Sequence, residues 1–304
     1  YKRQDLAILK GRVDALEVNQ NEFEAGGFSD TTVLDGKAIF DVASFDTDDD
    51  TYTGKTQFMY TYTMNLNTSF TGDDNLYTRI KTGNHGSWSK TKNAYNGYLS
   101  SANGNGDILE VDKLWYTTPV GENHTFTIGP KIENYYMHAT APSIYKPVLK
   151  AFTLGGNGAA YGASTNGGVG WAYNADNGFA ISSNVVSQGA NSGGVLNNES
   201  KTSWATQVGY TQPNYSVSAI LNMKYNSWID EYFQTTAGFA RGGDGNSTNV
   251  GLRAWWRPTD ADTAVPSISL GYDTSETGAS TNSNTTAYFV GLNWTDVILS
   301  LIHI

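Results

Sequence analysis

The chain has 304 residues, of which 39% are hydrophobic, with no cysteine and a formal net charge of −10. The lack of cysteine excludes disulfides, thiol nucleophiles and zinc–thiolate sites, and an acidic chain without a basic stripe argues against a nucleic-acid partner. No run approaches the ~18 consecutive apolar residues of a membrane helix. A polar average composition is also typical of a transmembrane barrel, because its strands alternate apolar and polar residues.

Residues 1–25 predict a helix that carries one apolar seam. The seam residues follow one another at steps of three and four, and are Leu6, Leu9, Val13, Leu16, Gln20 and Phe23. This is the a/d spacing of a coiled coil. Two interpretations remain open: an amphipathic helix packed on a globular core, or a short coiled coil that joins subunits, with Gln20 fixing its register.

From residue 32 onward the sequence predicts β-strands, because apolar and polar residues alternate with a period of two. In residues 57–67 the large side chains at alternate positions are Phe58, Tyr60, Tyr62, Met64 and Leu66. Twelve strands are predicted, at about 32–45, 55–68, 76–82, 108–117, 124–129, 167–173, 178–187, 201–211, 215–225, 249–257, 266–273 and 285–294. The apolar face of each strand would be buried in a soluble sandwich and would face lipid in an outer-membrane barrel.

The connections between these strands alternate between long and short. The long ones are 46–54, 83–107, 130–166, 188–200, 226–248 and 274–284, and the short ones are 69–75, 118–123, 174–177, 212–214 and 258–264. Outer-membrane barrels alternate in this way, because tight turns join their strands on the periplasmic side and loops join them outside. Aromatic residues beside the short turns, such as Tyr116, Tyr173 and Tyr210, favour a membrane interface as well.

Three stretches resemble a known family. They are residues 5–45 (DLAILKGRVDALEVNQNEFEAGGFSDTTVLDGKAIFDVASF), 114–130 (LWYTTPVGENHTFTIGP) and 291–297 (GLNWTDV). They look like the porins of cyanobacterial outer membranes, in the carbohydrate-selective OprB-like group, which are also named iron uptake porins. The resemblance implies an S-layer homology domain that binds a peptidoglycan-linked polymer, then a coiled-coil segment, then a barrel expected to have about sixteen strands.

Relative to that family, the sequence lacks the S-layer homology domain and has fewer predicted strands, and the tail 299–304 (LSLIHI) does not end a strand on an aromatic residue. A truncated barrel is therefore expected. The implied domains are a periplasmic coiled-coil helix at 1–25 and an all-β, transmembrane antiparallel β-barrel at 32–304. The implied location is a bacterial outer membrane. The implied partners are outer-membrane lipid, further copies in a homotrimer, and peptidoglycan through the missing domain.

If the aromatic parity faces lipid, the opposite parity lines a pore. On the first, third and tenth predicted strands this gives the pore-lining candidates Asp35, Lys37, Asp41, Tyr77, Arg79, Lys81, Arg253 and Arg257. Rings of charged side chains set the selectivity of wide pores, and a basic cluster in an acidic chain indicates a preference for anions. The alternative is that these charges pair with one another across the barrel wall.

The connection 130–166 is the longest and is the third on the extracellular side. By resemblance to general porins, in which that loop folds inward, it is the candidate constriction. Its charged and aromatic residues include Lys131, Glu133, Tyr135, Tyr136, Tyr145, Lys146 and Lys150. Such residues bind sugars by stacking or anions by charge. An ordinary surface loop is the alternative.

The sequence carries no catalytic or metal motif. Its four histidines form no H-E-x-x-H pair, and the glycine runs at 155–158 and 242–245 are not followed by the Lys-Ser/Thr of a nucleotide-binding loop. The acidic stretch 46–50 lacks the glycine and glutamate of an EF-hand, which leaves a solvated loop or a cation bridge to lipid headgroups. We expect no enzyme, no cofactor and no metal site.

The predicted function is a passive outer-membrane channel for small ions and small hydrophilic solutes. Within transport, the alternative is a pore that prefers carbohydrates or an iron species. Outside transport, the alternatives are a structural tether between outer membrane and peptidoglycan, and a soluble β-sandwich or lectin-like binding protein.

Overall fold

The computed structural model describes residues 31–44, 55–86, 98–156, 158–162, 165–228, 245–259, 265–277 and 284–294. The predicted helix 1–25 lies outside the described residues, and so do its seam residues Leu6, Leu9, Val13, Leu16, Gln20 and Phe23. The acidic stretch 46–50 also lies outside them.

One antiparallel sheet contains every described strand, and each strand pairs with its neighbours in sequence. The twelve strands occur where the alternation predicts them, with bounds that differ by a few residues. They are β1 (Thr32–Ala43), β2 (Gln57–Thr68), β3 (Asn75–Gly83), β4 (Glu110–Val120), β5 (His124–Ile132), β6 (Asn166–Asn174), β7 (Phe179–Gln188), β8 (Lys201–Gln212), β9 (Tyr215–Tyr225), β10 (Ser247–Trp256), β11 (Ser267–Thr277) and β12 (Asn284–Asn293).

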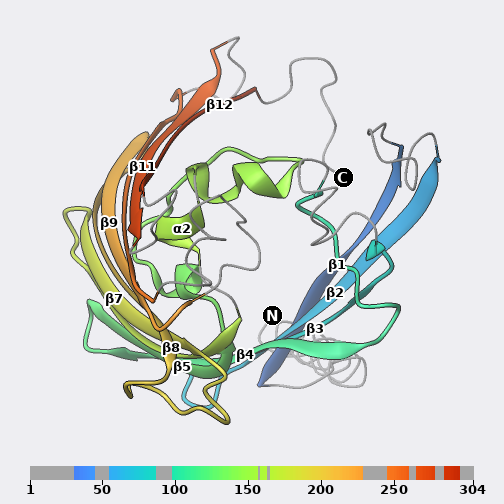
Figure 1. Cartoon of the computed structure of the whole chain (residues 1–304), viewed down its shortest axis with the longest axis horizontal. Coiled ribbons are helices and arrows are strands. Elements are labelled where there is room, and N and C mark those ends of the chain that lie inside the picture. Colours follow the sequence, from blue (N-terminus) through green and yellow to red (C-terminus); the bar gives the residue numbers. More distant parts are fainter. Residues whose placement is uncertain are drawn as a thin grey trace, which may run out of the picture.

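The sheet curves into a wall that surrounds an interior (Figure 1). Among the described residues, β1 and β12 are its two edges and do not pair with each other, so this part of the chain forms an open wall of twelve strands. The about sixteen strands implied by the resemblance are not reached in the described part.

The connection lengths alternate as predicted through β10 and differ after it. The β10–β11 connection spans residues 257–266, whereas the β11–β12 connection, predicted to be long, spans only 278–283. The β11–β12 connection is shorter because β11 continues to Thr277, past its predicted end at residue 273. The additional residues of β11 stay paired with β10, the last of them with Ser247.

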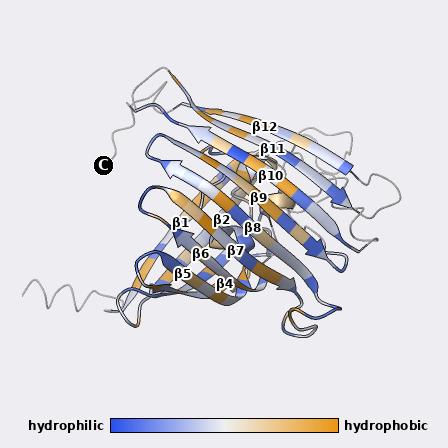
Figure 2. Ribbon diagram, turned by 90° about the vertical axis from the view of Figure 1, so that its left-hand side faces the viewer, coloured by the Kyte–Doolittle hydropathy of each residue, from blue (hydrophilic) through white to orange (hydrophobic). Residues whose placement is uncertain are grey.

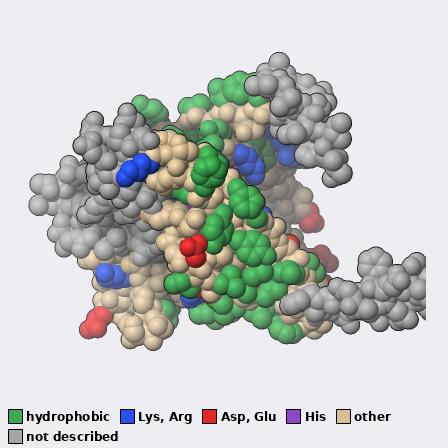
Figure 3. All heavy atoms as spheres, turned by 90° about the vertical axis from the view of Figure 1, so that its right-hand side faces the viewer, with side chains coloured by type: hydrophobic (Ala, Val, Ile, Leu, Met, Phe, Trp, Pro, Cys, Tyr) green, Lys and Arg blue, Asp and Glu red, His purple; other side chains and the backbone are tan. Residues whose placement is uncertain are grey.

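The outer face of the sheet is apolar. Phe40 of β1 and Phe58 of β2 are 81% and 78% exposed, and their ladder partners Tyr60 and Val42 share that face. Along the strands on the other side of the wall, such as β9, β10 and β11, hydrophobic and hydrophilic residues alternate (Figure 2). Hydrophobic side chains also gather over the outer surface on the side where β1 and β2 lie (Figure 3). The apolar parity of residues 57–67 therefore points outward.

The inner face is polar and mostly buried. Gln207, Asn222 and Asn249 are almost inaccessible to solvent, although such side chains are mostly exposed in soluble proteins. A soluble sandwich packs the apolar faces of two sheets together. A single sheet with a polar interior excludes that alternative.

The connection between β5 and β6 lies inside the curve of the wall (Figure 1). We call residues 133–165 the inward segment. It contains two 3₁₀ helices, η3 (Asn134–Met137) and η4 (Lys150–Gly155), and the short helix α2 (Gly158–Tyr161). No helix in the described part of the chain is both long and apolar enough to cross a membrane.

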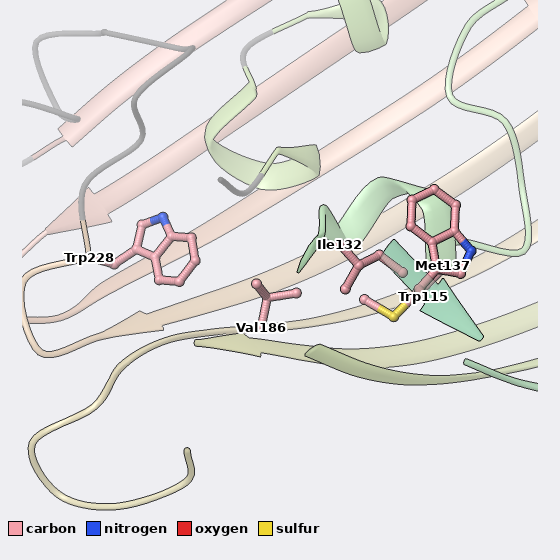
Figure 4. Packing of buried hydrophobic residues seen from close by; sticks show 5 residues of the cluster. All are labelled: Trp115, Ile132, Met137, Val186 and Trp228. Carbon is pink, nitrogen blue, oxygen red and sulfur yellow. The ribbon is translucent and has the colours of Figure 1, made fainter. Parts of the chain in front are cut away.

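Apolar packing in the interior is limited to small clusters. The largest joins side chains of the wall, of the inward segment and of the β9–β10 connection, namely Trp115, Ile132, Met137, Val186 and Trp228 (Figure 4). Most of the contacts that hold the inward segment are therefore polar.

Candidate functional site

Reciprocal hydrogen bonds attach the inward segment to the far wall. The backbone N–H of Thr140 donates to Oε1 of Gln207 at 2.9 Å, and Nε2 of Gln207 donates back to the Thr140 carbonyl at 2.8 Å. On β9, Asn222 donates to the carbonyl of Ala160 and Lys224 to that of Gly162, both at 3.0 Å. The polar inner face thus satisfies backbone groups of a segment that has little regular structure of its own.

Arg253 of β10 forms the most extensive of these attachments. Its guanidinium pairs with Asp273 of β11 at 2.8 Å, and both side chains are 1% exposed. Its Nε donates to the carbonyl of Leu154 at 2.9 Å. The guanidinium carbon also lies 4.6 Å from the ring centroid of Tyr161, which is within the range of a cation–π interaction.

Glycines on the inner face leave room for the inward segment. A Cβ at Gly271 would overlap with the carbonyl oxygen of Gly155, and a Cβ at Gly209 would overlap with the hydroxyl of Thr140. Glycine permits this close approach of the backbone because it has no side chain. The wall is therefore shaped to receive the segment.

A cavity of about 600 Å³ lies between the inward segment and the β1–β4 wall. The cavity is lined by residues of β1, β2, β3, β4, the end of β5 and the described part of the β3–β4 connection, together with the inward segment. Its charged lining residues are six bases and three acids: Lys37, Arg79, Lys81, Lys113, Lys131, Lys150, Glu110, Asp112 and Glu133. The excess of bases over acids is three.

A β-bulge brings two adjacent charged residues of β4 to this cavity. Arg79 is paired with Lys113 but the next residue, Ile80, is paired with Val111, so Asp112 is the additional residue of the bulge. Both Asp112 and Lys113 line the cavity. The bulge interrupts the strict alternation of faces, and a period of two read from the sequence cannot place both residues inside.

Two ion pairs use four of these charges. Arg79 donates from Nε to Asp112 at 2.5 Å. Lys113 donates to Glu133 at 2.8 Å and also contacts Thr165, whose hydroxyl donates to Glu133 at 2.9 Å. Burial raises the pKa of Glu133, but the ammonium groups of Lys113 and Lys150 lower it by more, so its pKa lies below the ordinary value. The two ends of the inward segment are thus tied to β4.

Aromatic rings form a continuous row of contacts beside the charges, in which Tyr77 and Trp115 are stacked and the other pairs are tilted. The ring centroids of Tyr77 and Trp115 are 4.2 Å apart, those of Trp115 and Tyr136 are 4.8 Å apart, and those of Tyr136 and Tyr135 are 4.5 Å apart. The three tyrosines also line the cavity. Charged and aromatic surfaces therefore meet in one water-accessible space.

Residues 3–297 match one protein family, described as "Carbohydrate-selective porin, OprB family". The chain belongs to this family. Porins are channels that carry out no catalytic step, so membership of the OprB family confirms that the chain is not an enzyme.

Two cyanobacterial proteins are similar in sequence to this OprB-family chain. The protein alr4550 of Nostoc sp. is 33% identical over 186 residues, covering 56% of this chain and 32% of that protein. The protein sll0772 of Synechocystis sp. is 34% identical over 129 residues, covering 41% of this chain and 23% of that protein. The chain therefore spans about a third or less of the length of the curated relatives that it matches.

Two solved structures share the fold. Pseudomonas putida OprB in its high-pH structure has a TM-score of 0.52 at 9% identity, covering 88% of this chain and 71% of that one. The loop L8 deletion mutant of OmpT, an outer membrane protein of Vibrio cholerae, has a TM-score of 0.50 at 12% identity, covering 86% and 76%. At these identities the likeness concerns the fold alone.

In this OprB-family chain, the predicted pore-lining residues fall into two groups. Lys37, Tyr77, Arg79 and Lys81 line the cavity. Asp35 and Asp41 share the inner parity of β1. Asp35 accepts from Asn65 and Asn67 at 2.6 and 3.0 Å. Asp41 contacts Nε2 of His85 at 2.7 Å and accepts from the hydroxyl of Ser101 at 2.9 Å.

The two predicted arginines of the tenth strand lie elsewhere. Arg253 has the expected parity, but the inward segment covers it, so it attaches that segment instead of facing the open cavity. Arg257 lies beyond the end of β10, where its Nε donates to the carbonyl of Pro213 in the neighbouring turn at 2.7 Å. The pattern of alternation carries no information about what covers a side chain.

The predicted constriction residues divide in the same way. Lys131, Glu133, Tyr135, Tyr136 and Lys150 line the cavity. Tyr145 packs against Phe289 of β12 with ring centroids 5.6 Å apart, and Lys146 is exposed away from the cavity lining. The sequence interpretation missed Glu110, Asp112 and Lys113, since the bulge changes the parity of β4.

Proposed function

We propose that the chain forms the pore domain of an outer-membrane porin, a water-filled channel through which small ions and small hydrophilic solutes diffuse passively. The observation that carries this proposal is the pairing of an apolar outer face with a polar interior into which the inward segment folds. Outer-membrane barrels present an apolar band to lipid and a polar lumen to water. Membership of the OprB family supports the same function.

The inward segment narrows this channel and gives it a preference for anions. It occupies the space enclosed by the wall and leaves the cavity of about 600 Å³ beside β1–β4. The cavity has three more bases than acids in its lining, and charged rings at a narrow point attract ions of the opposite sign. The pairs of Arg79 with Asp112 and of Lys113 with Glu133 reduce the field without cancelling it.

Several finer features belong to the full-length protein. They are closure of the wall into a barrel by further strands, assembly as a homotrimer, and an N-terminal coiled-coil helix at 1–25 on the periplasmic side. An S-layer homology domain would bind peptidoglycan, and the long connections of the wall would face outward. A preference for carbohydrates is supported by the family description. A preference for an iron species is the alternative, which the name iron uptake porin implies.

Single-channel recording from the full-length protein in a planar bilayer tests this function. We expect stable conductance steps and, under a salt gradient, a reversal potential of the sign that indicates anion selectivity. A cation-selective reversal potential would refute the basic constriction. Absence of any conductance from correctly inserted protein would favour a structural tether between outer membrane and peptidoglycan.

A further inference from the structure

We propose that the cavity is a saturable binding site for small solutes that combine an anionic group with a sugar ring, namely sugar phosphates and sugar acids. This inference rests on the channel function proposed above and adds a ligand class to it. Three features of the cavity carry it: a pair of lysines that form no ion pair within the described residues, an aromatic surface beside them, and a volume of suitable size.

Lys37 and Lys81 form the anion-binding end. In the ladder, Lys37 lies opposite Thr63, and Thr63 lies opposite Lys81 on its other side. The two lysines therefore share one level of the wall and one face, about 10 Å apart at Cα given the usual strand spacing. Long, flexible ammonium side chains at that separation converge on a single phosphate or carboxylate between them.

Three of the other bases of the cavity have polar partners within the described residues, whereas the ammonium groups of these two lysines have none. Arg79 is paired with Asp112, Lys113 is paired with Glu133, and Lys131 donates to the carbonyl of Val111 at 2.7 Å. Among the described residues, neither Lys37 nor Lys81 has a carboxylate within ion-pair distance. The row continues to Glu110 of β4, the ladder partner of Lys81, so the two lysines carry more positive charge than this one carboxylate offsets.

Tyr77 and Tyr136 form the ring-binding end. Each is packed on a side of Trp115, which holds the rings in place. The hydroxyl of Tyr77 donates to Oδ1 of Asn65 at 2.8 Å, and Arg79 donates to the hydroxyl of Tyr136 at 3.1 Å. A pyranose ring has an apolar face and a polar rim, so fixed aromatic rings bordered by polar groups are complementary to it.

The two ends lie at a distance that fits one small solute. Tyr77, Arg79 and Lys81 are successive inner positions of β3, so Tyr77 and Lys81 are about 13 Å apart along the strand at Cα. The long, flexible side chain of Lys81 allows its ammonium group to lie nearer to Tyr77 than its Cα does. The cavity volume of about 600 Å³ lies within the range of small-molecule sites. A neutral sugar would use only the aromatic end, and an inorganic anion would use only the lysine row.

Block of the single-channel current tests the proposal on the full-length protein. Glucose 6-phosphate, glucose and inorganic phosphate are added separately at equal ionic strength. We expect glucose 6-phosphate to reduce the open current saturably, at a concentration at least about tenfold below that needed for either single-group compound, because two sets of contacts act together. Equal block by phosphate and glucose 6-phosphate would overturn the sugar component, and equal block by glucose would overturn the anionic component.

Variants separate the lysine row from other charges. The double variant K37Q/K81Q should weaken block by glucose 6-phosphate at least about tenfold, since it removes two charged hydrogen-bond donors, and should leave any block by glucose unchanged. Lys146→Gln removes a lysine that is exposed outside the cavity and should leave both blocks unchanged. Unaltered block in K37Q/K81Q would overturn the site. Conducting channels that no solute blocks would overturn it too, with the channel function intact, whereas a lack of conductance would remove the channel function itself.

Discussion

The guanidinium of Arg253 in β10 lies over the ring of Tyr161 in α2, with 4.6 Å between the guanidinium carbon and the ring centroid. The two residues are 92 positions apart in the sequence. Arg253 belongs to the wall and Tyr161 to the inward segment, so their contact joins the two. Arg253 also holds the carbonyl of Leu154 and the carboxylate of Asp273. One side chain of the wall thus fixes both η4 and α2.

Arg253→Met should destabilise the protein by about 3 to 5 kcal/mol, because it leaves the carboxylate of Asp273 buried without its ionic partner. The free energy of unfolding is measured by denaturant titration in a lipid or detergent environment. Arg257→Met is the matched control and should lower that free energy by about 1 kcal/mol or less, since Arg257 is exposed beyond β10 and loses one solvent-exposed hydrogen bond to the carbonyl of Pro213. Equal effects of the two variants would contradict the role of Arg253.

Gly271→Ala should displace the inward segment and raise the single-channel conductance. The added Cβ would overlap with the carbonyl of Gly155, and overpacking of this kind typically costs about 1 to 3 kcal/mol. Gly86→Ala is the control, because a Cβ at Gly86 meets no atom within 4 Å. If the conductance of Gly271→Ala equals that of the unmodified protein, the segment does not narrow the channel at this point.

Glu133→Gln should increase anion selectivity. The change removes one of three carboxylates from the cavity lining and frees the positive charge of Lys113, its partner at 2.8 Å. The reversal potential under a salt gradient should therefore shift further in the anion-selective direction. The exposed Glu122 in the β4–β5 turn provides the comparison: Glu122→Gln should leave the reversal potential unchanged. A shift of the same size in both variants would show that overall charge, and not the cavity, sets the selectivity.

Acidification should weaken the attachment of η3 through His138. Burial lowers the pKa of His138 to about 4, below the value of about 6.5 for a free histidine. Between these pH values the unfolded chain binds more protons than the folded one, so the free energy of unfolding falls as the pH is lowered from about 6.5 to about 4. This contribution levels off below the folded pKa.

Comparison of the unmodified protein with His138→Gln isolates that contribution. The unfolding free energy of each is measured across the same pH range, and their difference should change with pH in the stated window and be constant outside it. His138 contacts Asn184 of β7 through Nδ1 at 3.2 Å, so the variant also shifts the baseline. A difference that does not depend on pH would contradict the prediction.

Local pattern was sufficient to predict the wall. A period of two between apolar and polar residues depends only on neighbouring positions of one strand, so Phe40 and Phe58 could be assigned to one face and Lys37 and Thr63 to the other without a structure. The pairing of strands across the short connections followed as well, because tight turns join neighbours in sequence as hairpins. The β11–β12 connection was the exception, since the end of β11 depends on its pairing with β10.

The arrangement of the site was decided by tertiary structure. The sequence alone predicted the strands, the outward aromatic face and the long 130–166 connection, and it placed Lys37, Arg79 and Lys81 on the face opposite the aromatic residues, because each of these depends on local composition and spacing. It could not determine that a bulge brings Asp112 and Lys113 together, nor that the inward segment covers Arg253 and leaves the cavity beside β1–β4. These features depend on contacts between residues far apart in the chain, and the free energy of such contacts exists only when the wall and the segment are packed against each other.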